Sequence, residues 1–282
     1  MKINFTNLDK ILNNHELLLL GIGASLIVIQ LGVTSRIDSS NIFGTSLVFL
    51  AAVSSLIWDK RNKLTLESAF LPSVCGLVLI GFVYLLGLFT INSTFLWYLA
   101  PLVSAFGLAL LASGFKGLKQ YQGELLALLC LAASIVLPKF IFDISPLTAK
   151  FSAFVLWCGG FKFTLAGQKI LTPTGGIEVY SGCSGIELVI QMVGFAVVFL
   201  LMFNLNLKQK VITLIVAPFM GFIVNGVRVA LMALIVVYGD QQSFKYWHDG
   251  DGSLIFSTIA VVLFGLFCWI LLRSQKENMG IK

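Results

Sequence analysis

The sequence predicts an all-α polytopic membrane protein with about eight transmembrane helices, an interfacial helix and a short extracytoplasmic β-like loop. Of its 282 residues, 58% are hydrophobic and 11% are charged, and the mean hydropathy is +0.95. These values lie far outside the range of soluble globular proteins. Repeated apolar runs of about 18 residues or more are each long enough to cross a hydrocarbon core about 30 Å thick. We therefore expect one integral membrane domain over residues 1–282.

Eight apolar runs, each bounded by charged or turn-forming residues, predict the spans. They cover residues 17–33, 41–58, 69–91, 94–114, 124–142, 186–204, 211–238 and 253–272. We expect the first run to be a span and not a cleavable signal peptide, because no small-residue cleavage site follows it and further spans come at once.

The distribution of Lys and Arg predicts the orientation, because positive charge is retained on the cytoplasmic side. With the N terminus inside, the predicted cytoplasmic segments carry twelve basic residues: Lys2, Lys10, Lys60, Arg61, Lys63, Lys116, Lys119, Lys208, Lys210, Arg273, Lys276 and Lys282. The outer segments carry six: Arg36, Lys139, Lys150, Lys162, Lys169 and Lys245. Both termini are therefore predicted to be cytoplasmic. This asymmetry also accounts for the net charge of +6, and we expect no nucleic-acid partner, because no basic patch is interleaved with aromatic residues.

The segment 143–183 breaks the pattern of spans. Residues 144–160, "ISPLTAKFSAFVLWCGG", are apolar but too short and too interrupted to cross, so we predict an interfacial or re-entrant helix. Residues 161–182 combine β-branched and aromatic residues with a Thr-Pro-Thr-Gly-Gly break. That composition indicates a short hairpin or extended loop at the outer surface.

The five cysteines are scattered, with no C-x-x-C pair, so we expect no metal, no dithiol centre and no cofactor. Four of them are interpreted as small core residues: Cys75, Cys130, Cys158 and Cys268. The fifth, Cys183, stands in "YSGCSGIEL" (180–188), directly before an apolar run.

Cys183 is a candidate nucleophile because of its position at a predicted helix start. Ser184 and Glu187 have the spacing of a capping box, which places the first turn just after the thiol. Free backbone N–H groups and the helix macrodipole stabilise a thiolate there, and Gly182 and Gly185 leave room for a substrate backbone. The competing interpretation is a buried small residue, with Glu187 serving only as a cap.

Arg228 is the second candidate, because it lies in the middle of the apolar run "GFIVNGVRVALMALIVV", with Asn225 one turn away on the same face. An arginine at membrane depth costs about 2.5 to 3.5 kcal/mol even on insertion scales, so it normally faces the bundle interior and has a function. Snorkelling to the outer surface is a weak alternative, because about ten apolar residues separate Arg228 from that end.

His248 is the third candidate, in the loop predicted for "KYWHDGDGSLIF" on the same outer side as Cys183. Imidazole titrates near neutral pH and can carry a proton between a thiol and a leaving amine. Asp249 and Asp251 are candidates to orient it, or are simply turn residues. The other histidine, His15, is interpreted as an ordinary polar residue near the cytoplasmic N terminus.

These pieces together resemble the exosortase/archaeosortase family of polytopic membrane cysteine transpeptidases. The matching motifs are "CSG" at 183–185, "NGVR" at 225–228 as N-x-x-R, and "HDGDG" at 248–252 as H-x-x-x-G. They occur in the family's order, and the resemblance covers mainly residues 120–272. We therefore divide the chain into N-terminal spans in 1–120 and a catalytic membrane core in 121–272. The cyanobacterial branch is one candidate for its place in the family.

The resemblance implies an enzyme of the bacterial inner membrane with its active site on the extracytoplasmic side. Its partners would be secreted proteins with a C-terminal recognition motif such as Pro-Glu-Pro, a transmembrane helix and a basic tail, besides membrane lipids and an envelope acceptor of unknown identity. Cys183 then corresponds to the nucleophile, His248 to the general acid/base, and Arg228 to the group that stabilises the intermediate or positions the carbonyl. Asn225, Ser184, Gly185 and Gly252 correspond to supporting residues.

Two hypotheses from other functional classes remain open. One is a transporter or channel in which Arg228 binds an anionic substrate and Cys183 is incidental; the lack of a detectable internal repeat counts against it. The other is a non-catalytic membrane assembly factor with an unreactive Cys183. Rapid, pH-sensitive alkylation of Cys183 that substrate blocks would favour the enzyme.

The charge asymmetry generates the first testable prediction, that residues 143–183 and 239–252 lie on the external side while both termini are cytoplasmic. Reporter fusions after residues 170 and 245 should give the same, extracytoplasmic, signal. Opposite signals at these two positions would separate Cys183 from His248 and refute the proposed constellation.

Overall fold

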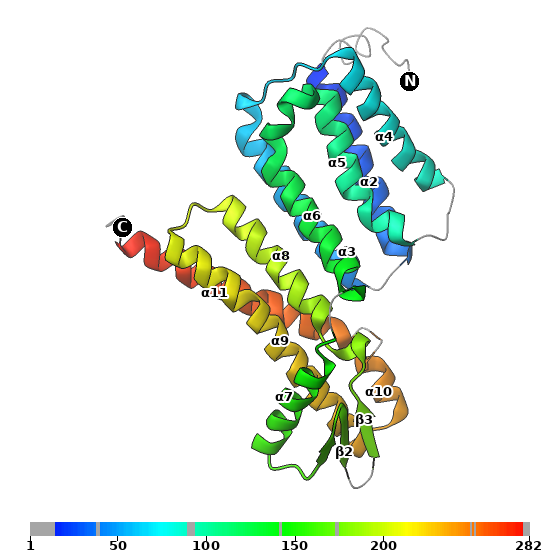
Figure 1. Ribbon diagram of the computed structural model, residues 1–282, viewed down its shortest axis with the longest axis vertical. Helices are drawn as coiled ribbons and strands as arrows, with labels where there is room; N and C mark the ends of the chain where they lie inside the picture. The colour runs from blue at the N-terminus through cyan, green and yellow to red at the C-terminus, as the bar shows by residue number, and fades with distance from the viewer. Residues whose placement is uncertain are drawn as a thin grey trace, which may run out of the picture. The chain divides into compact units, whose positions relative to one another are not determined.

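The computed structural model describes residues 15–37, 40–88, 94–140, 143–172, 175–248, 250 and 252–278 (Figure 1). Most of these residues are helical, as the sequence predicts. The chain divides into two compact units, Met1–Ala132 and Ala133–Lys282, and each is considered by itself below.

The first unit consists of long helices joined by short connections. Its elements are α2 (His15–Ile37), α3 (Ser40–Lys60), η1 (Arg61–Lys63), α4 (Phe70–Leu88), α5 (Thr94–Gly117), η2 (Leu118–Tyr121) and α6 (Gln122–Val136), of which the last continues into the second unit. The helices α4 and α5 lie side by side (Figure 1). A Cβ atom on Gly76 would lie 2.6 Å from the carbonyl oxygen of Gly107, so small residues permit this close approach, as is usual between membrane helices.

Helices long and apolar enough to cross a membrane number seven among the described residues. One of them, Leu96–Val136, is 41 residues long and contains two of the eight predicted spans. Within it the backbone leaves helical geometry at Gly114, with φ +64° and ψ −173°, and the 3₁₀ turn η2 precedes α6. The prediction of an all-α polytopic membrane protein is confirmed. The predicted span 124–142 is too long, because α6 ends at Val136; residues 141–142 lie outside the described residues.

The second unit combines three long helices with short elements. These are η3 (Leu137–Lys139), α7 (Ser145–Cys158), β1 (Thr164–Ala166), β2 (Lys169–Thr172), β3 (Gly175–Glu178), η4 (Ser181–Cys183), α8 (Ile186–Met202), α9 (Leu207–Tyr238), α10 (Gln241–His248) and α11 (Gly252–Asn278). The helix α10 has no counterpart among the predicted elements, because the sequence predicts only an external segment between the spans 211–238 and 253–272.

The helix α7 agrees with the short helix predicted for residues 144–160. Its 14 residues extend about 21 Å, which is less than the hydrocarbon thickness. One face is buried against α9, where Ser152 donates a hydrogen bond to the Gly226 carbonyl at 2.8 Å. Asp143 precedes the helix and accepts hydrogen bonds from the hydroxyl and the backbone N–H of Ser145, which lower the pKa of this carboxyl group.

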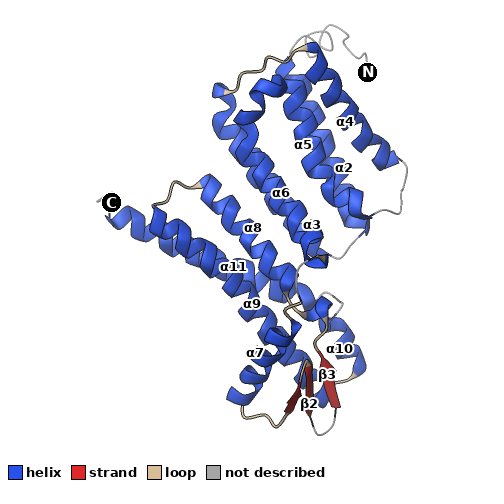
Figure 2. Ribbon diagram, in the orientation of Figure 1, coloured by secondary structure: helices blue, strands red, loops and turns tan. Residues whose placement is uncertain are grey.

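The predicted β-like loop is a three-stranded antiparallel sheet in the order β1-β2-β3, drawn in red in Figure 2. A two-residue turn joins β1 to β2, and its first residue, Gly167, has φ +64°, as a type II′ hairpin requires. Ile170 of β2 and Val179, the residue after β3, are almost fully buried against α7 and α9 residues. This apolar cluster fixes the strand that leads towards Cys183.

The helix α9 is the central element of the second unit. A capping box begins it, in which Asn206 accepts from the Gln209 backbone and Gln209 accepts from the Asn206 backbone. Two glycines let other helices approach: Gly221 faces the α8 backbone, and a Cβ atom on Gly226 would lie 2.2 Å from Cδ1 of Phe151 on α7. The helix can therefore pack closely on α7 and α8 at once.

The close approach of α7 and α9 generates a prediction for Gly226→Ala. The added methyl group overlaps the Phe151 ring, so we expect a loss of about 1 to 3 kcal/mol of unfolding free energy in detergent. Gly265→Ala is the matched control, because a Cβ atom there meets nothing within 4 Å; it should be neutral or slightly stabilising. Equal stability of the two variants would contradict the packing described here.

Candidate active site

The segment that carries Cys183 connects β3 to α8 through a 3₁₀ turn. The backbone N–H of Cys183 donates to the Tyr180 carbonyl at 2.8 Å, and that of Ser184 donates to Ser181 at 3.2 Å. Gly185 then has φ +83°, and α8 begins at Ile186. The thiol is half-buried and lies three residues ahead of the helix.

The predicted capping box at Ser184 and Glu187 is wrong. An N-cap residue needs extended backbone geometry, whereas Ser184 has φ −60° and ψ −27° and belongs to the 3₁₀ turn. The N-cap is Gly185, which has no side chain to bond. The Ser184 hydroxyl instead donates to the Ser181 carbonyl at 2.6 Å and accepts from the Ile186 backbone at 3.3 Å, so it joins the turn to the helix.

Ser184 and Gly185, two of the predicted supporting residues, have tightly constrained geometry. Ser184 is 1% exposed, and its carbonyl accepts a hydrogen bond from the Thr148 hydroxyl of α7 at 2.7 Å. Gly185 adopts a left-handed conformation that other residues rarely adopt. A Cβ atom there would also lie 2.3 Å from Nδ2 of Asn225, so both the backbone and the space require glycine.

Asn225 fixes the backbone at the thiol. Its side-chain amide donates to the carbonyl oxygen of Cys183 at 3.0 Å, and the residue is only 2% exposed. The bond connects α9 to a residue 42 positions earlier. Asn225, which is predicted to support the site, thus contacts the backbone of the candidate nucleophile directly.

His248 is the last residue of the helix α10 and does not lie in a loop as predicted. Asp240 caps this helix by accepting a hydrogen bond from the Ser243 backbone at 2.6 Å, and hydrogen bonds from the backbone and side chain of Ser243 lower the pKa of Asp240. The His248 ring stacks on Phe244, with centroids 5.1 Å apart and an angle of 16° between the planes. The helix and the stacking ring together orient the imidazole.

The thiol and the imidazole are in direct contact. Sγ of Cys183 lies 3.0 Å from Nε2 of His248, across 65 residues of sequence. The hydroxyl of Tyr180 lies 3.3 Å from the same nitrogen. Tyr180 is not among the site residues predicted from the sequence, although it begins the "YSGC" stretch. Its position three residues before Cys183, across one 3₁₀ turn, is the signal that the sequence offers.

Arg228 joins this pair through the backbone of His248. Its Nη2 donates to the His248 carbonyl at 2.8 Å, one of the carbonyls that a helix leaves unsatisfied at its C terminus. Arg228 lies ten residues before the end of α9, and α10 packs against α9, so that His248 comes within reach of the guanidinium. The Nε atom of Arg228 is buried and has no hydrogen-bond partner among the described residues.

Gly252, the remaining residue predicted to support the site, begins α11 in a buried position. A Cβ atom there would lie 2.9 Å from ring atoms of both Tyr246 and Trp247. Glycine therefore lets α11 start directly against the end of α10. Asp249 and Asp251, the candidates to orient His248 or to form a turn, lie outside the described residues.

The other four cysteines are unpaired thiols. Cys268 is buried, Cys75 and Cys130 are half-buried, and Cys158 is exposed. The prediction of a core position is therefore wrong for Cys158, which ends α7 on its outer face. Within the described ranges, no group of three or more His, Cys, Asp or Glu side chains is arranged to hold a metal ion.

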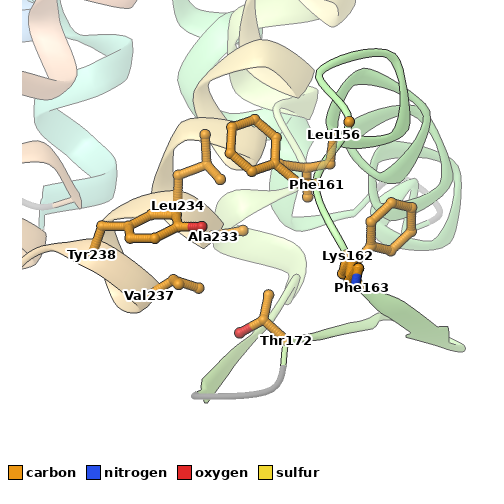
Figure 3. Close-up of a pocket in the computed structure, with 10 residues that line it drawn as sticks. Leu156, Phe161, Lys162, Phe163, Thr172, Ala233, Leu234, Val237 and Tyr238 are labelled. Carbon is orange, nitrogen blue, oxygen red and sulfur yellow. The ribbon is translucent and has the colours of Figure 1, made fainter.

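A cavity of about 340 Å³ lies between α9 and the segment that links α7 to β1 (Figure 3). Leu234, Val237 and Tyr238 line it from α9, and Phe161 and Phe163 from the linking segment. Two of its lining residues, Leu156 and Ala233, belong to the apolar cluster against which Cys183 packs. The cavity is thus adjacent to the core that supports the site, but its lining includes none of the predicted catalytic residues.

Comparison with known proteins identifies the family. Neither a search of curated proteins nor a search of solved structures found a match. The family model for the transmembrane exosortase matches residues 37–265, which is most of the chain and includes Cys183, Asn225, Arg228, His248 and Gly252. The protein belongs to the transmembrane exosortase family.

Proposed function

We propose that this membrane protein is a cysteine transpeptidase that cleaves the C-terminal sorting signals of secreted proteins. The observation that carries the proposal is the 3.0 Å contact between Sγ of Cys183 and Nε2 of His248. A thiol and an imidazole at hydrogen-bond distance form the usual pair of an activated nucleophile and its base. Membership of the exosortase family supports a peptidase or transpeptidase of this kind.

In the first half of the reaction, Nε2 of His248 accepts the thiol proton and the thiolate of Cys183 attacks the scissile carbonyl carbon. The tetrahedral intermediate then collapses, the C–N bond breaks, and the imidazolium gives its proton to the departing amine. The product is a thioester between Cys183 and the N-terminal part of the substrate. In the second half, an amine or other acceptor on the envelope attacks the thioester carbonyl while His248 takes its proton. The C–S bond then breaks, and His248 gives that proton to the departing thiolate of Cys183. Water as the acceptor would make the reaction hydrolysis.

Arg228 has two roles in this mechanism. Through Nη2 it holds the carbonyl of His248 and so positions the imidazole. Arg228 as a whole is only half-buried, and its guanidinium group carries a permanent positive charge. This charge stabilises the substrate oxygen on which negative charge develops in the transition state, where such an interaction accelerates the reaction.

Membership of the exosortase family supports the proposed substrates and location. The proposed substrates are secreted proteins with a recognition motif such as Pro-Glu-Pro, a transmembrane helix and a basic tail. The proposed location is the bacterial inner membrane, with Cys183 and His248 on the extracytoplasmic side, in agreement with the distribution of Lys and Arg. The transporter hypothesis is less well supported, because Nη2 of Arg228 donates to the carbonyl of His248, whose side chain lies beside the thiol of Cys183. This donor is therefore not directed into a transport pathway.

Replacement of Cys183 tests the nucleophile. Cys183→Ala should abolish cleavage and adduct formation without loss of folding, because a half-buried thiol at a turn contributes little packing. Cys183→Ser should be nearly inactive, since a hydroxyl is far less acidic than a thiol. His248→Ala should retain slow thiol alkylation but lose turnover.

The measurement is mass spectrometry of membranes incubated with a protein carrying a candidate sorting tail, and Cys158→Ala is the control that should keep full activity. An adduct on another residue, or undiminished processing in Cys183→Ala, refutes the mechanism.

Arg228→Lys tests the guanidinium. Lysine keeps the positive charge but replaces the planar guanidinium with a single ammonium group. That group cannot donate to the His248 carbonyl and at the same time present a second directed donor. We expect normal insertion and a loss of activity of roughly 10²-fold or more, measured as the rate of tail cleavage in membranes. Full activity in Arg228→Lys would mean that the guanidinium has no part in the transition state.

A further inference from the structure

The strand β3 forms one edge of the small sheet. Among the described residues, β3 pairs with β2 on one side and with no strand on the other. The strand packs closely on α9, because a Cβ atom on Gly175 would lie only 3.0 Å from the side chain of Val236. The backbone groups along the outer edge of β3 are therefore held in place by the contact with α9.

The register shows which backbone groups point away from the sheet. The backbone N–H of Val179 donates to the carbonyl of Gln168 at 3.0 Å. Ile177, which lies two residues before Val179, is paired with Ile170 of β2. In an antiparallel ladder only alternate residues bond to the neighbouring strand. Gly176 and Glu178 therefore direct their N–H and C=O groups outward, and both residues are exposed.

This edge leads directly to the thiol. Two residues after Glu178 comes Tyr180, whose hydroxyl meets His248, and three residues later comes Cys183. Four residues of strand extend about 13 Å, so an extended peptide paired along β3 would continue to the level of Tyr180 and Cys183. A peptide must present its scissile carbonyl to the thiol in a fixed register, and backbone pairing with β3 provides one.

We propose that the outer edge of β3 binds an extended segment of the protein substrate, next to the scissile bond, as a fourth strand of the sheet. This inference rests on the proposed function, since it assigns the peptide-binding surface of the same site. Strand addition draws its affinity from main-chain hydrogen bonds, so the edge recognises an extended backbone. Specificity for side chains must then come from neighbouring surfaces.

The test compares two reagents with the same electrophile on the full-length protein in membranes. Acetyl-alanine chloromethyl ketone has almost no backbone to pair, whereas acetyl-tetraalanine chloromethyl ketone can pair along β3. With Cys183 labelling followed by mass spectrometry, we expect the longer reagent to react faster by on the order of tenfold, which corresponds to one or two backbone hydrogen bonds. Glu178→Pro removes the outward N–H without breaking the ladder to β2, and it should abolish this advantage while leaving the rate of the short reagent unchanged.

Two controls separate the backbone from the side chain and from folding. Glu178→Ala keeps the N–H and should keep the advantage of the longer reagent. N-methylation of the tetraalanine reagent, one residue at a time, should reduce labelling of the unaltered protein at alternate positions only. An equal rate for both reagents, an advantage that survives in Glu178→Pro, or sensitivity to methylation without alternation would overturn the β3 proposal. Failure of the short reagent to label Cys183 would instead refute the catalytic proposal itself.

Discussion

The site depends on the hydrogen bond between the thiol of Cys183 and the imidazole of His248. These residues belong to elements that are distant in sequence, at the end of a 3₁₀ turn before α8 and at the end of α10. The helix α9 contacts both of these elements and so helps to hold the thiol and the imidazole together. Asn225 bonds the carbonyl of Cys183 and Arg228 bonds the carbonyl of His248. Three residues apart on one helix, they share a face and set the separation of the two reacting groups.

This arrangement explains the spacing in "NGVR" and the small residues around it. The amide and the guanidinium both project from α9 towards backbone carbonyls, while Gly226 between them admits the Phe151 ring of α7. Gly185 leaves the space that the Asn225 amide occupies, and Gly252 lets α11 begin beside α10. Each glycine is explained by a close contact that a side chain would obstruct, so these positions are part of the geometry of the site even where they take no part in chemistry.

Much of the fold was predictable, because apolar runs of membrane length and their polar boundaries depend on local composition alone. Each predicted span overlaps a helix, although 124–142 extends past the end of α6 at Val136. The Thr-Pro-Thr-Gly-Gly break between apolar, β-branched residues correctly indicates a hairpin. The predictions that failed depend on tertiary geometry. The left-handed backbone at Gly185 displaced the expected helix start, which sequence spacing alone could not show. The helix α10 is short and polar, so its residues were read as a loop, and its stabilising contacts with α9 and α11 arise only in the folded unit.

Among the candidate residues, the sequence indicated which side chains are chemically unusual but not how they meet. Arg228 was selected for its depth in an apolar run, yet its contact with the His248 carbonyl requires the chain reversal after Tyr238. Tyr180 was missed because an aromatic residue near a membrane surface is common and becomes notable only when its hydroxyl is found beside Nε2 of His248.

The most direct test of the central claim is the rate of Cys183 alkylation by a small membrane-impermeant reagent as a function of pH, compared between the unaltered protein and His248→Gln. If the imidazole activates the thiol, the unaltered protein should react at least about tenfold faster near pH 7, and the difference should shrink above about pH 9, where free thiols ionise by themselves. Identical pH profiles for the two proteins would contradict the account, because they would show that the contact between Cys183 and His248 does not activate the thiol.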